Sequence, residues 1–395
     1  MPPGASRHFT IRCDSRRHRV ALQPARFWQR TKCPACAQVV DASRARRAAK
    51  WLVGDAPRSA VRYKNRFRIV PIDGMVWLWT AMILVVTLLL HTVADRWWPA
   101  SVLLFLGRWP WLVPALPLLL LALVVKRRTT AIFAATATVV GLFGVMQLSL
   151  GSARIITPEY PESRVRIISY NINGDGPAPL QLRELLTEWG PDVLAVQECG
   201  ETAREQLSNI AGYQSDVGMT CLVTRFEIVS IDSMRRDAFR DANGAAWVKR
   251  YRLKGPFGEF DFTNLHLDTP RKAFEVLISG DSGATTAIRD KTAIRDVESR
   301  LARRWADLGK GPRLVAGDFN MPVESAIFRE HWGSMQDGWE RAGMGFGYTR
   351  FAGWIRLRID HILADENWSV QQARVLPDYG SDHRPLMVEV DLNAK

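Results

Sequence analysis

Long apolar runs occupy the middle of the chain, and short ones separated by polar residues occupy its C-terminal part. Three long runs cover about 75–94, 103–125 and 130–150. From residue 164 the runs shorten to eight residues or fewer and alternate with segments of helical spacing. Roughly 20 apolar residues match the hydrocarbon core of a bilayer, whereas short buried runs are typical of strands. The pattern predicts a three-helix transmembrane anchor followed by an α/β domain.

These patterns divide the chain into four regions. Residues 1–74 form a tail, 75–150 the three spans, 151–163 a Pro-containing linker and 164–395 the α/β domain. The second span contains Pro110, Pro114 and Pro117, so it needs Arg108 to snorkel or part of 101–106 to enter the bilayer. With no charge buried mid-span and no paired repeat, the spans predict an anchor rather than a transport pathway.

Within the α/β domain, apolar runs predict strands at 165–170, 193–196, 221–223, 247–248, 260–266 and 314–316. Residues 180–189 have the spacing of an amphipathic helix, and 287–308 predict a long charged one. Strands that alternate with helices indicate an α/β architecture.

Charge is distributed unevenly along the chain. Residues 1–74 hold 17 Lys and Arg against 4 Asp and Glu, whereas residues 151–395 hold 31 against 35. A second basic cluster, Lys126-Arg127-Arg128, separates the second and third runs. The positive-inside rule therefore places both basic segments in the cytoplasm. Three crossings then put the C-terminal domain on the extracytoplasmic side of the cell (inner) membrane, in a multi-pass protein.

The tail carries a metal-binding motif. Cys33-Pro34-Ala35-Cys36 has the spacing of a zinc knuckle, and Cys13 and His18 are further candidate ligands. Arg16 stands where the second Cys of another knuckle would lie, so the tail resembles a zinc ribbon with one knuckle degraded. The alternative is a basic tail that binds anionic lipid without metal.

Polar side chains follow the ends of several predicted strands. The clearest example is Gly317-Asp318-Phe319-Asn320, which comes directly after the apolar run 314–316. Each such residue alone could cap a helix or form a turn. Together they predict one site, and its members are Asn171, Glu198, His266, Asp318, Asn320, Asp360, Asp382 and His383.

The residue types of this set suit hydrolysis of a phosphate ester. Carboxylates such as Glu198 and Asp382 are ligands that Mg²⁺ prefers. A His beside an Asp can accept a proton from water, and amide and imidazole donors can stabilise charge on phosphoryl oxygens. Cys199 and Cys221 also lie in this domain and could pair outside the cell, although sequence alone does not give their geometry.

Six ordered stretches resemble motifs of the endonuclease/exonuclease/phosphatase family, whose members include exonuclease III, deoxyribonuclease I, neutral sphingomyelinases and inositol polyphosphate 5-phosphatases. The resemblance covers residues 164–391. Its stretches are Ser-Tyr-Asn-Ile-Asn at 169–173, Pro-Asp-Val-Leu-Ala-Val-Gln-Glu at 191–198, Asn-Leu-His-Leu-Asp at 264–268, Gly-Asp-Phe-Asn at 317–320, Arg-Ile-Asp-His-Ile at 358–362 and Ser-Asp-His-Arg-Pro at 381–385. The resemblance implies a four-layer α/β/β/α sandwich with its site at one end, between the two sheets.

The resemblance also implies roles. Glu198 would be the principal ligand of Mg²⁺ or Mn²⁺, with Asn171 and Asp382 at or near the metal. Asp318 and Asn320 would position the attacking water and the phosphate. His266 would donate to the phosphate or the leaving oxygen.

For the remaining pair, the resemblance implies that Asp360 orients His383. It does not decide whether Asp318 or His383 takes the proton. Asn171, His266 and Asn320 would also contact the substrate.

These features predict a membrane-anchored phosphoesterase that cleaves a phosphodiester or phosphomonoester by in-line attack of activated water. No protein partner is inferred. One alternative is a tethered nuclease for extracellular DNA, although the domain's acidic balance disfavours it unless a local patch such as Arg271-Lys272 or Arg350, Arg356 and Arg358 binds phosphate. A second is a catalytically silent module that binds a phosphorylated ligand.

Overall fold

The structure is a computed structural model that describes residues 71–151, 164–174, 176–241 and 243–393, together with the backbone of two short N-terminal strands. The chain divides into two compact units, Met1–Val70 and Pro71–Lys395. In the first unit, β1 (Phe9–Arg12) and β2 (Arg19–Leu22) pair antiparallel. The candidate zinc ligands Cys13, His18, Cys33 and Cys36 all lie outside the described residues, and the zinc site stays a prediction.

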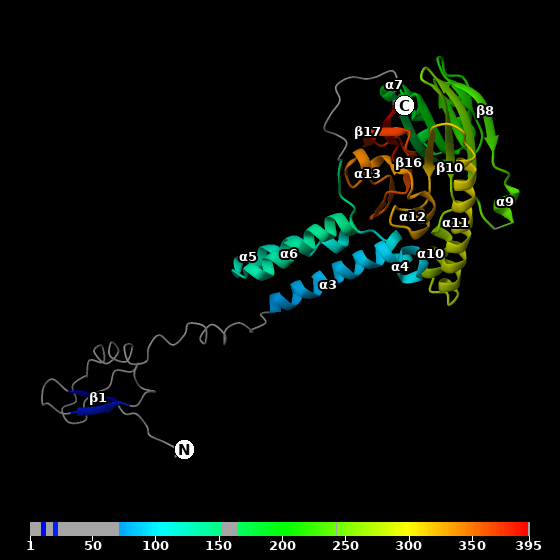
Figure 1. Ribbon diagram of the computed structural model, residues 1–395. Helices are drawn as coiled ribbons and strands as arrows, with labels where there is room; N and C mark the ends of the chain where they lie inside the picture. The colour runs from blue at the N-terminus through cyan, green and yellow to red at the C-terminus, as the bar shows by residue number, and fades with distance from the viewer. Residues whose placement is uncertain are drawn as a thin grey trace. The chain divides into compact units, whose positions relative to one another are not determined.

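The second unit begins with four apolar helices. They are α3 (Pro71–Thr92), α4 (Trp98–Phe105), α5 (Ala115–Val124) and α6 (Arg128–Val140), the last of which continues as a π-helical turn to Val145. Helices α3, α5 and α6 run side by side (Figure 1). Within the part of the chain that the structure describes, two helices, 71–92 and 128–145, are long and apolar enough to cross a membrane.

The second predicted span differs from a straight helix. The segments 98–105 and 109–124 are apolar enough together, but the chain bends by 82° between them. Residues 101–105 therefore belong to α4 and do not extend the direction of α5. Arg108, at the bend, does not snorkel, because it is buried and pairs with the carboxylate of Glu324. The Glu324 carboxylate neutralises the guanidinium charge, so the Arg108 side chain does not need to extend to solvent.

Two six-stranded sheets form the centre of the second unit. The first has the order β17-β18-β4-β5-β7-β6, and its strands are β17 (Trp368–Val375), β18 (Leu386–Leu392), β4 (Arg164–Gly174), β5 (Val193–Cys199), β7 (Cys221–Thr224) and β6 (Gln214–Asp216). The second has the order β12-β16-β11-β10-β9-β8, and its strands are β12 (Gln336–Asp337), β16 (Asp360–Ala364), β11 (Arg313–Asp318), β10 (Gly258–His266), β9 (Trp247–Gly255) and β8 (Glu227–Ser233). Only the pairs β4–β5 and β10–β11 are parallel among these ladders.

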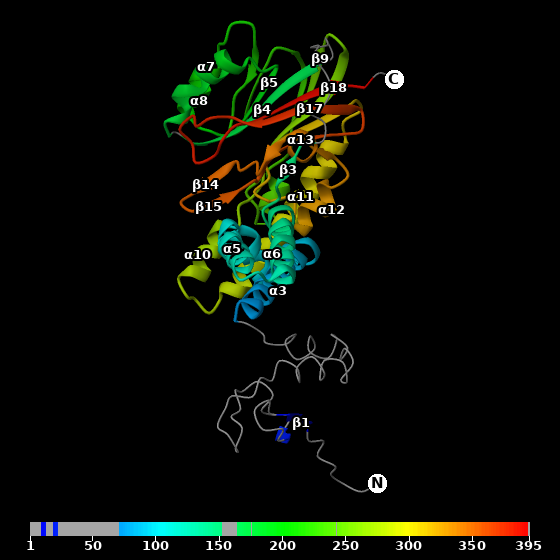
Figure 2. The same cartoon turned by 90° about the vertical axis from the view of Figure 1, so that its left-hand side faces the viewer.

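Helices cover the outer faces of both sheets (Figures 1 and 2). Helices α7 (Ala178–Trp189) and α8 (Glu201–Leu207) pack on the first sheet, and α11 (Ala284–Asp307) and α12 (Ala326–Trp332) pack on the second. Successive residues of a strand point to opposite faces. Ile167 accordingly lies in the core between the sheets, and Ile168 lies in the core under α7. The arrangement confirms the four-layer α/β/β/α sandwich.

Smaller elements complete the second unit. They are α9 (Asp237–Arg240), α10 (Arg271–Ile278), α13 (Gly338–Ala342) and the two-stranded ladders β3 (Ser149–Leu150) with β13 (Met344–Gly345) and β14 (Arg350–Ala352) with β15 (Ile355–Leu357). The β3–β13 ladder pairs the end of the apolar region with the sandwich.

A polar seam joins the apolar helices to the sandwich. The buried Asp95 carboxylate accepts hydrogen bonds from the Ser325 hydroxyl and from the Ala326 backbone N–H, 2.8 Å away, at the start of α12. Close by, Arg108 pairs with Glu324. Both acids are therefore neutralised or hydrogen-bonded by groups from across the seam, as buried charges require.

Candidate active site

The site is built where strands of both sheets end. Parallel pairing of β10 and β11 puts His266 opposite Asp318, and antiparallel pairing of β11 and β16 puts Asp318 opposite Asp360. In the other sheet, β4 and β5 run parallel, with Asn171 opposite the residue that precedes Glu198. Because parallel strands end at the same edge, segments far apart in sequence deliver side chains to one place.

The backbone at these strand ends is unusual. Gly317 has φ of 152°, and a Cβ at this position would lie 1.9 Å from the carbonyl oxygen of Leu265. Only glycine therefore permits the close approach of β10 and β11. Glu198 and Asn320 both have φ of 50°, a region that non-glycine residues seldom adopt. Such strain is concentrated at functional sites, where the surrounding structure maintains it.

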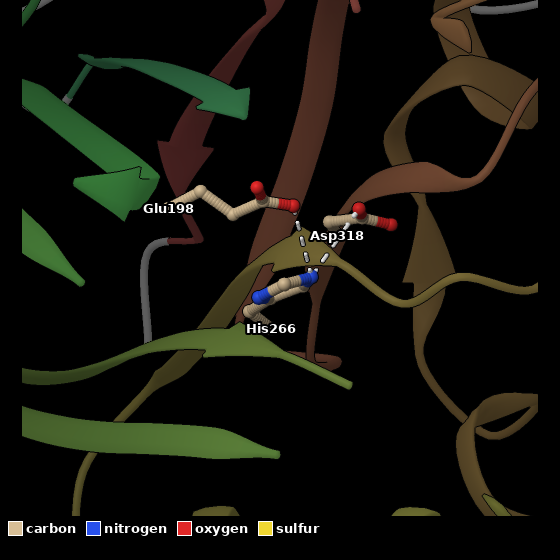
Figure 3. Close-up of side chains that lie close together, drawn as sticks. All are labelled: Glu198, His266 and Asp318. Carbon is tan, nitrogen blue, oxygen red and sulfur yellow. Dashed lines mark ion pairs between the residues drawn. The ribbon is translucent and has the colours of Figure 1, made fainter. Parts of the chain in front are cut away.

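Glu198, His266 and Asp318 converge in space (Figure 3). His266 Nε2 lies 3.6 Å from Glu198 Oε1 and 3.8 Å from Asp318 Oδ2. Asn171 bridges the two acids, because its Nδ2 donates to Glu198 Oε1 at 3.0 Å and to Asp318 Oδ2 at 2.9 Å. Asn320 donates its backbone N–H to Asp318 Oδ1 at 2.8 Å, which orients that carboxylate.

A second group shares Asp318 and lies deeper. His383 Nδ1 forms a 2.8 Å contact with Asp360 Oδ2, and its Nε2 points to Asp318 Oδ2 at 3.8 Å. All three side chains are buried. One oxygen of Asp360, Oδ1, is buried without a hydrogen-bond partner among the described residues.

Burial and charge shift the pKa values of this group. Burial and the charge of Asp360 raise the pKa of Asp318 above its usual range. For His383, burial acts to lower the pKa, but the charges of Asp360 and Asp318 outweigh it and raise the pKa to about 9. Two carboxylates close together disfavour double ionisation, and a cation beside them relieves the repulsion. Both shifts favour the protonated form of the group concerned.

Asp382 belongs to neither group. Its carboxylate forms an ion pair with Arg350, while its Oδ1 has no hydrogen-bond partner in the described part of the chain. The structure therefore brings together seven of the eight residues predicted for the site. The assignment of Asp382 as a ligand stays a prediction.

Two buried polar residues behind the site received no role from the sequence. Gln197 precedes Glu198, and its Nε2 donates to Oδ1 of Asn264 at 2.8 Å. Asn264 in turn donates to the Cys221 carbonyl at 2.9 Å. Because Gln197 belongs to one sheet and Asn264 to the other, this pair fixes the two sheets together directly behind the acids. The signal that could have identified these two residues is a polar amide side chain within an otherwise apolar strand.

Arg295 of α11 is a further supporting residue that the sequence did not reveal. It is fully buried, and its Nη2 donates to the backbone oxygen of Asn320 at 2.7 Å. Its guanidinium lies 5.1 Å from the ring centroid of Phe105 in α4. On a helix with many charged residues, nothing in the sequence marks the one that faces inward.

The basic residues predicted as a local phosphate-binding patch lie in different environments. Arg358 is buried and pairs with Asp337 at 2.9 Å, so it supports the fold and is not exposed to a ligand. Arg271, Lys272 and Arg350 instead line the cavity beside the site. A disulfide joins Cys199 to Cys221, with 6.0 Å between their Cα atoms, next to Glu198.

The first group fits a divalent metal. One oxygen each of Glu198 and Asp318 and one nitrogen of His266 lie within 4.8 Å of one another. The Glu198 side chain is 38% exposed and lines a cavity of about 500 Å³, which leaves room for water and substrate oxygens. Mg²⁺ keeps several waters and binds through one or two carboxylates plus substrate phosphate. Glu198, at the cavity, and the buried Asp318 next to it meet this need.

Comparisons with known proteins identify the family. The model of the endonuclease/exonuclease/phosphatase family matches residues 168–383. A solved structure of a family member from Bacteroides thetaiotaomicron is 19% identical, covers 60% of this chain and 100% of its own, and has a TM-score of 0.45. Humanized TDP2 from D. rerio is 17% identical, with 58% and 99% covered and a TM-score of 0.46.

A mannosyl-6-phosphatase from Bacteroides thetaiotaomicron is also similar, at 19% identity, with 57% of this chain and 99% of its own covered and a TM-score of 0.42. No curated protein matches the chain. Because the family model spans more than half of the residues, the chain belongs to the endonuclease/exonuclease/phosphatase family.

Proposed function

We propose that this protein is a metal-dependent phosphoesterase that hydrolyses a phosphodiester or phosphomonoester by in-line attack of water. The observation that carries the proposal is the convergence of Glu198, His266 and Asp318, of which Glu198 and His266 line the cavity, with the buried Asp360–His383 pair beside them. Such a set supplies metal ligands, a proton acceptor and cationic donors without a nucleophile that would form a covalent intermediate.

Each residue has a role that follows from its surroundings. When bound, a divalent metal would be held by Glu198 and would polarise a phosphoryl oxygen. Asp318, whose raised pKa favours proton uptake, accepts the proton of the attacking water. His383 donates from Nε2 to the phosphate, since Asp360 holds its other nitrogen. Asn171 and Asn320 hold the two acids in place, and His266 stands beside the leaving oxygen.

Hydrolysis of bis(p-nitrophenyl) phosphate by the full chain tests the function. We expect turnover with Mg²⁺ or Mn²⁺ and none with EDTA, and a loss on the order of 10³-fold in Glu198→Gln, because the neutral amide is a poor metal ligand. Glu205→Gln, an exposed substitution on the neighbouring helix α8, is the matched control and should keep full activity. Equal activity of Glu198→Gln and the control would remove Glu198 from the mechanism.

We also propose that the apolar helices anchor the protein in a membrane, with the sandwich on the extracytoplasmic side. Asp73 near the start of α3 accepts from Thr130 and pairs with Arg127 at 3.7 Å, so the start of α3 and the basic α5–α6 turn lie at the same end of the bundle. That end lies away from the sheets (Figure 1). The Cys199–Cys221 disulfide suits an oxidising compartment.

A reporter enzyme fused after Lys395 tests this orientation. One that is active only outside the cytoplasm should give signal, and the same reporter fused before Met1 should not. The reverse result would contradict the proposed orientation and leave the phosphoesterase proposal untouched.

A nuclease is the second candidate, because Arg271, Lys272 and Arg350 line the cavity and could contact phosphates. The acidic balance of residues 151–395 opposes it, since duplex binding requires several neutralised phosphates. Parallel assays with DNA and with bis(p-nitrophenyl) phosphate separate the two enzymes. Phosphate binding without cleavage of any ester would favour the silent binding module.

A further inference from the structure

We propose that the substrate is a lipid phosphate ester that enters the active site from the membrane. Its apolar chain would lie against Phe105, Phe274 and Ile278 while its phosphate reaches Glu198 and His266. The inference rests on the proposed function and deepens it by naming the substrate class.

The cavity joins the catalytic residues to the apolar helices. Glu198, His266 and Asn320 line it together with Phe105 of α4. The region that precedes the sandwich therefore contributes directly to the wall of the site. A segment that only anchors the protein would not need to line the site.

Most of the remaining wall is apolar and comes from two segments of the sandwich. Phe274 and Ile278 belong to α10, whereas Ile355, Leu357 and Ile359 belong to β15 and the residues after it. Phe274 packs on Phe105, with 5.4 Å between ring centroids. Both views place α10 beside the end of the helix bundle that faces the sandwich (Figures 1 and 2). A small hydrophilic phosphoester would gain nothing from such a wall, whereas a hydrocarbon chain would.

Large apolar side chains surround the same end of the bundle and remain exposed. Ile278 is 85% exposed and Trp354, in the β14–β15 turn, is 50% exposed. The indole N–H of Trp109 donates to the Trp354 carbonyl at 3.0 Å, which ties that turn to the bend before α5. Exposed Trp side chains at the end of membrane-spanning helices are typical of the bilayer interface. The mouth of the cavity would thus lie at the level of the lipid head groups.

Charges near the mouth fit a head group. Arg271 and Lys272 are exposed on the first turn of α10, one turn from Phe274. Basic residues above an apolar surface favour anionic lipid, because the phosphate stays hydrated while the chain is buried. Duplex DNA would instead need basic residues spread over a wide face, which the net acidic sandwich does not provide.

Binding of short alkyl phosphates, from butyl to octyl, tests the inference on the full chain in phosphatidylcholine nanodiscs with Mg²⁺. Calorimetry reports affinity without requiring turnover. We expect affinity to rise about two- to fourfold for each added methylene, as for a chain that enters an apolar wall. The slope should be clearly smaller in Ile278→Ser and Phe274→Ser, while Leu180→Ser, an exposed leucine of α7, should retain it.

The outcomes separate the inference from the proposed function. An affinity that does not depend on chain length, or the same slope in Ile278→Ser as in wild type, overturns lipid entry. Because Ile278 is exposed, its substitution does not threaten folding, and Phe105→Ser can then be examined in the same way. Failure of the proposed function would appear separately, as no metal-dependent hydrolysis of bis(p-nitrophenyl) phosphate by wild type.

Discussion

Two buried Asp–His pairs each take one residue from the short strand β16, and they differ in the hydrogen bonds of their remaining atoms. Asp360 and His361 are neighbours in β16, so their side chains point to opposite faces of the sheet. Asp360 contacts His383 at 2.8 Å, and His361 contacts Asp337 at 2.7 Å. By distance and burial the two pairs are almost the same.

The contacts of the other side-chain atoms distinguish the two pairs, which we call the closed pair (Asp337–His361) and the open pair (Asp360–His383). In the Asp337–His361 pair, the other ring nitrogen contacts the Met321 carbonyl at 2.8 Å and the other oxygen of Asp337 pairs with Arg358. In the Asp360–His383 pair, Oδ1 of Asp360 has no partner among the described residues and His383 Nε2 faces another acid.

A buried polar group left without a partner costs stability, so the open pair needs a reason to exist. Under the proposed function, binding of a phosphate and a metal would supply that reason. We therefore assign the closed pair to the support of the fold and propose the open pair as part of the site.

Removing the open histidine should have the largest effect. His383→Gln keeps a hydrogen-bond donor but loses the charge, and we expect hydrolysis to fall on the order of 10³-fold, within the range of acid–base and electrostatic contributions. The melting temperature should stay close to wild type. His331→Gln, which removes a histidine paired with Asp296 outside the site, is the control and should retain activity. Full turnover in His383→Gln would end the distinction between the pairs.

Removing the closed histidine should act on stability. His361→Leu leaves Asp337 Oδ2 and the Met321 carbonyl without a donor, which should cost roughly 2–4 kcal/mol. The melting temperature of the full chain would then fall by about 5–10 °C, while activity of the folded fraction persists. An inactive protein with an unchanged melting temperature would assign His361 to the site instead.

The smallest effect concerns pH. Although burial opposes it, the charge of Arg358 and the hydrogen bond from His361 hold the pKa of Asp337 well below its usual range. A carboxyl whose folded pKa is depressed stabilises the protein above its unfolded pKa of about 3.9, and this contribution is lost as pH falls below that value. Melting temperatures measured from pH 6 to pH 3 should decline more steeply in wild type than in Asp337→Asn.

Asp318 should show the opposite sign. Its raised folded pKa means that the ionised form costs stability at neutral pH, and the cost disappears as pH falls. In the Asp337 test, melting temperatures of Asp337→Asn and wild type that decline equally with pH would contradict the assignment of Asp337–His361 as the closed pair.

Part of the fold and of the candidate site could be predicted from the sequence alone. Apolar runs ending in Gly-Asp, Gln-Glu or Leu-His predicted strands that deliver polar residues, and the ordered motifs indicated the family and its sandwich. The local pattern of a strand is enough for this, because burial on both faces requires an apolar run and a site requires that it end in polar groups. Bounds were close as well: the strand predicted at 314–316 is β11, Arg313–Asp318.

Other features depended on contacts between distant segments. A snorkelling Arg108 was one of two predicted ways to complete the second span, yet this side chain pairs with Glu324, 216 positions away. The metal-ligand role of Asp382 stays a prediction, and the fold adds an ion pair with Arg350 that the sequence did not indicate. A charged side chain takes whichever partner the fold brings near, and sequence spacing does not record that partner.

The ordered motifs were enough to indicate the family, the sandwich that the family resemblance implies and the set of residues that could form the site, because motif order can be read directly from the chain. Contacts within the fold were needed to show which of two adjacent Asp–His pairs is open, which arginine supports Asn320, and that Phe105 lies in the wall of the cavity. Each of these depends on what packs against a side chain from elsewhere in the chain, and packing is a property of the fold.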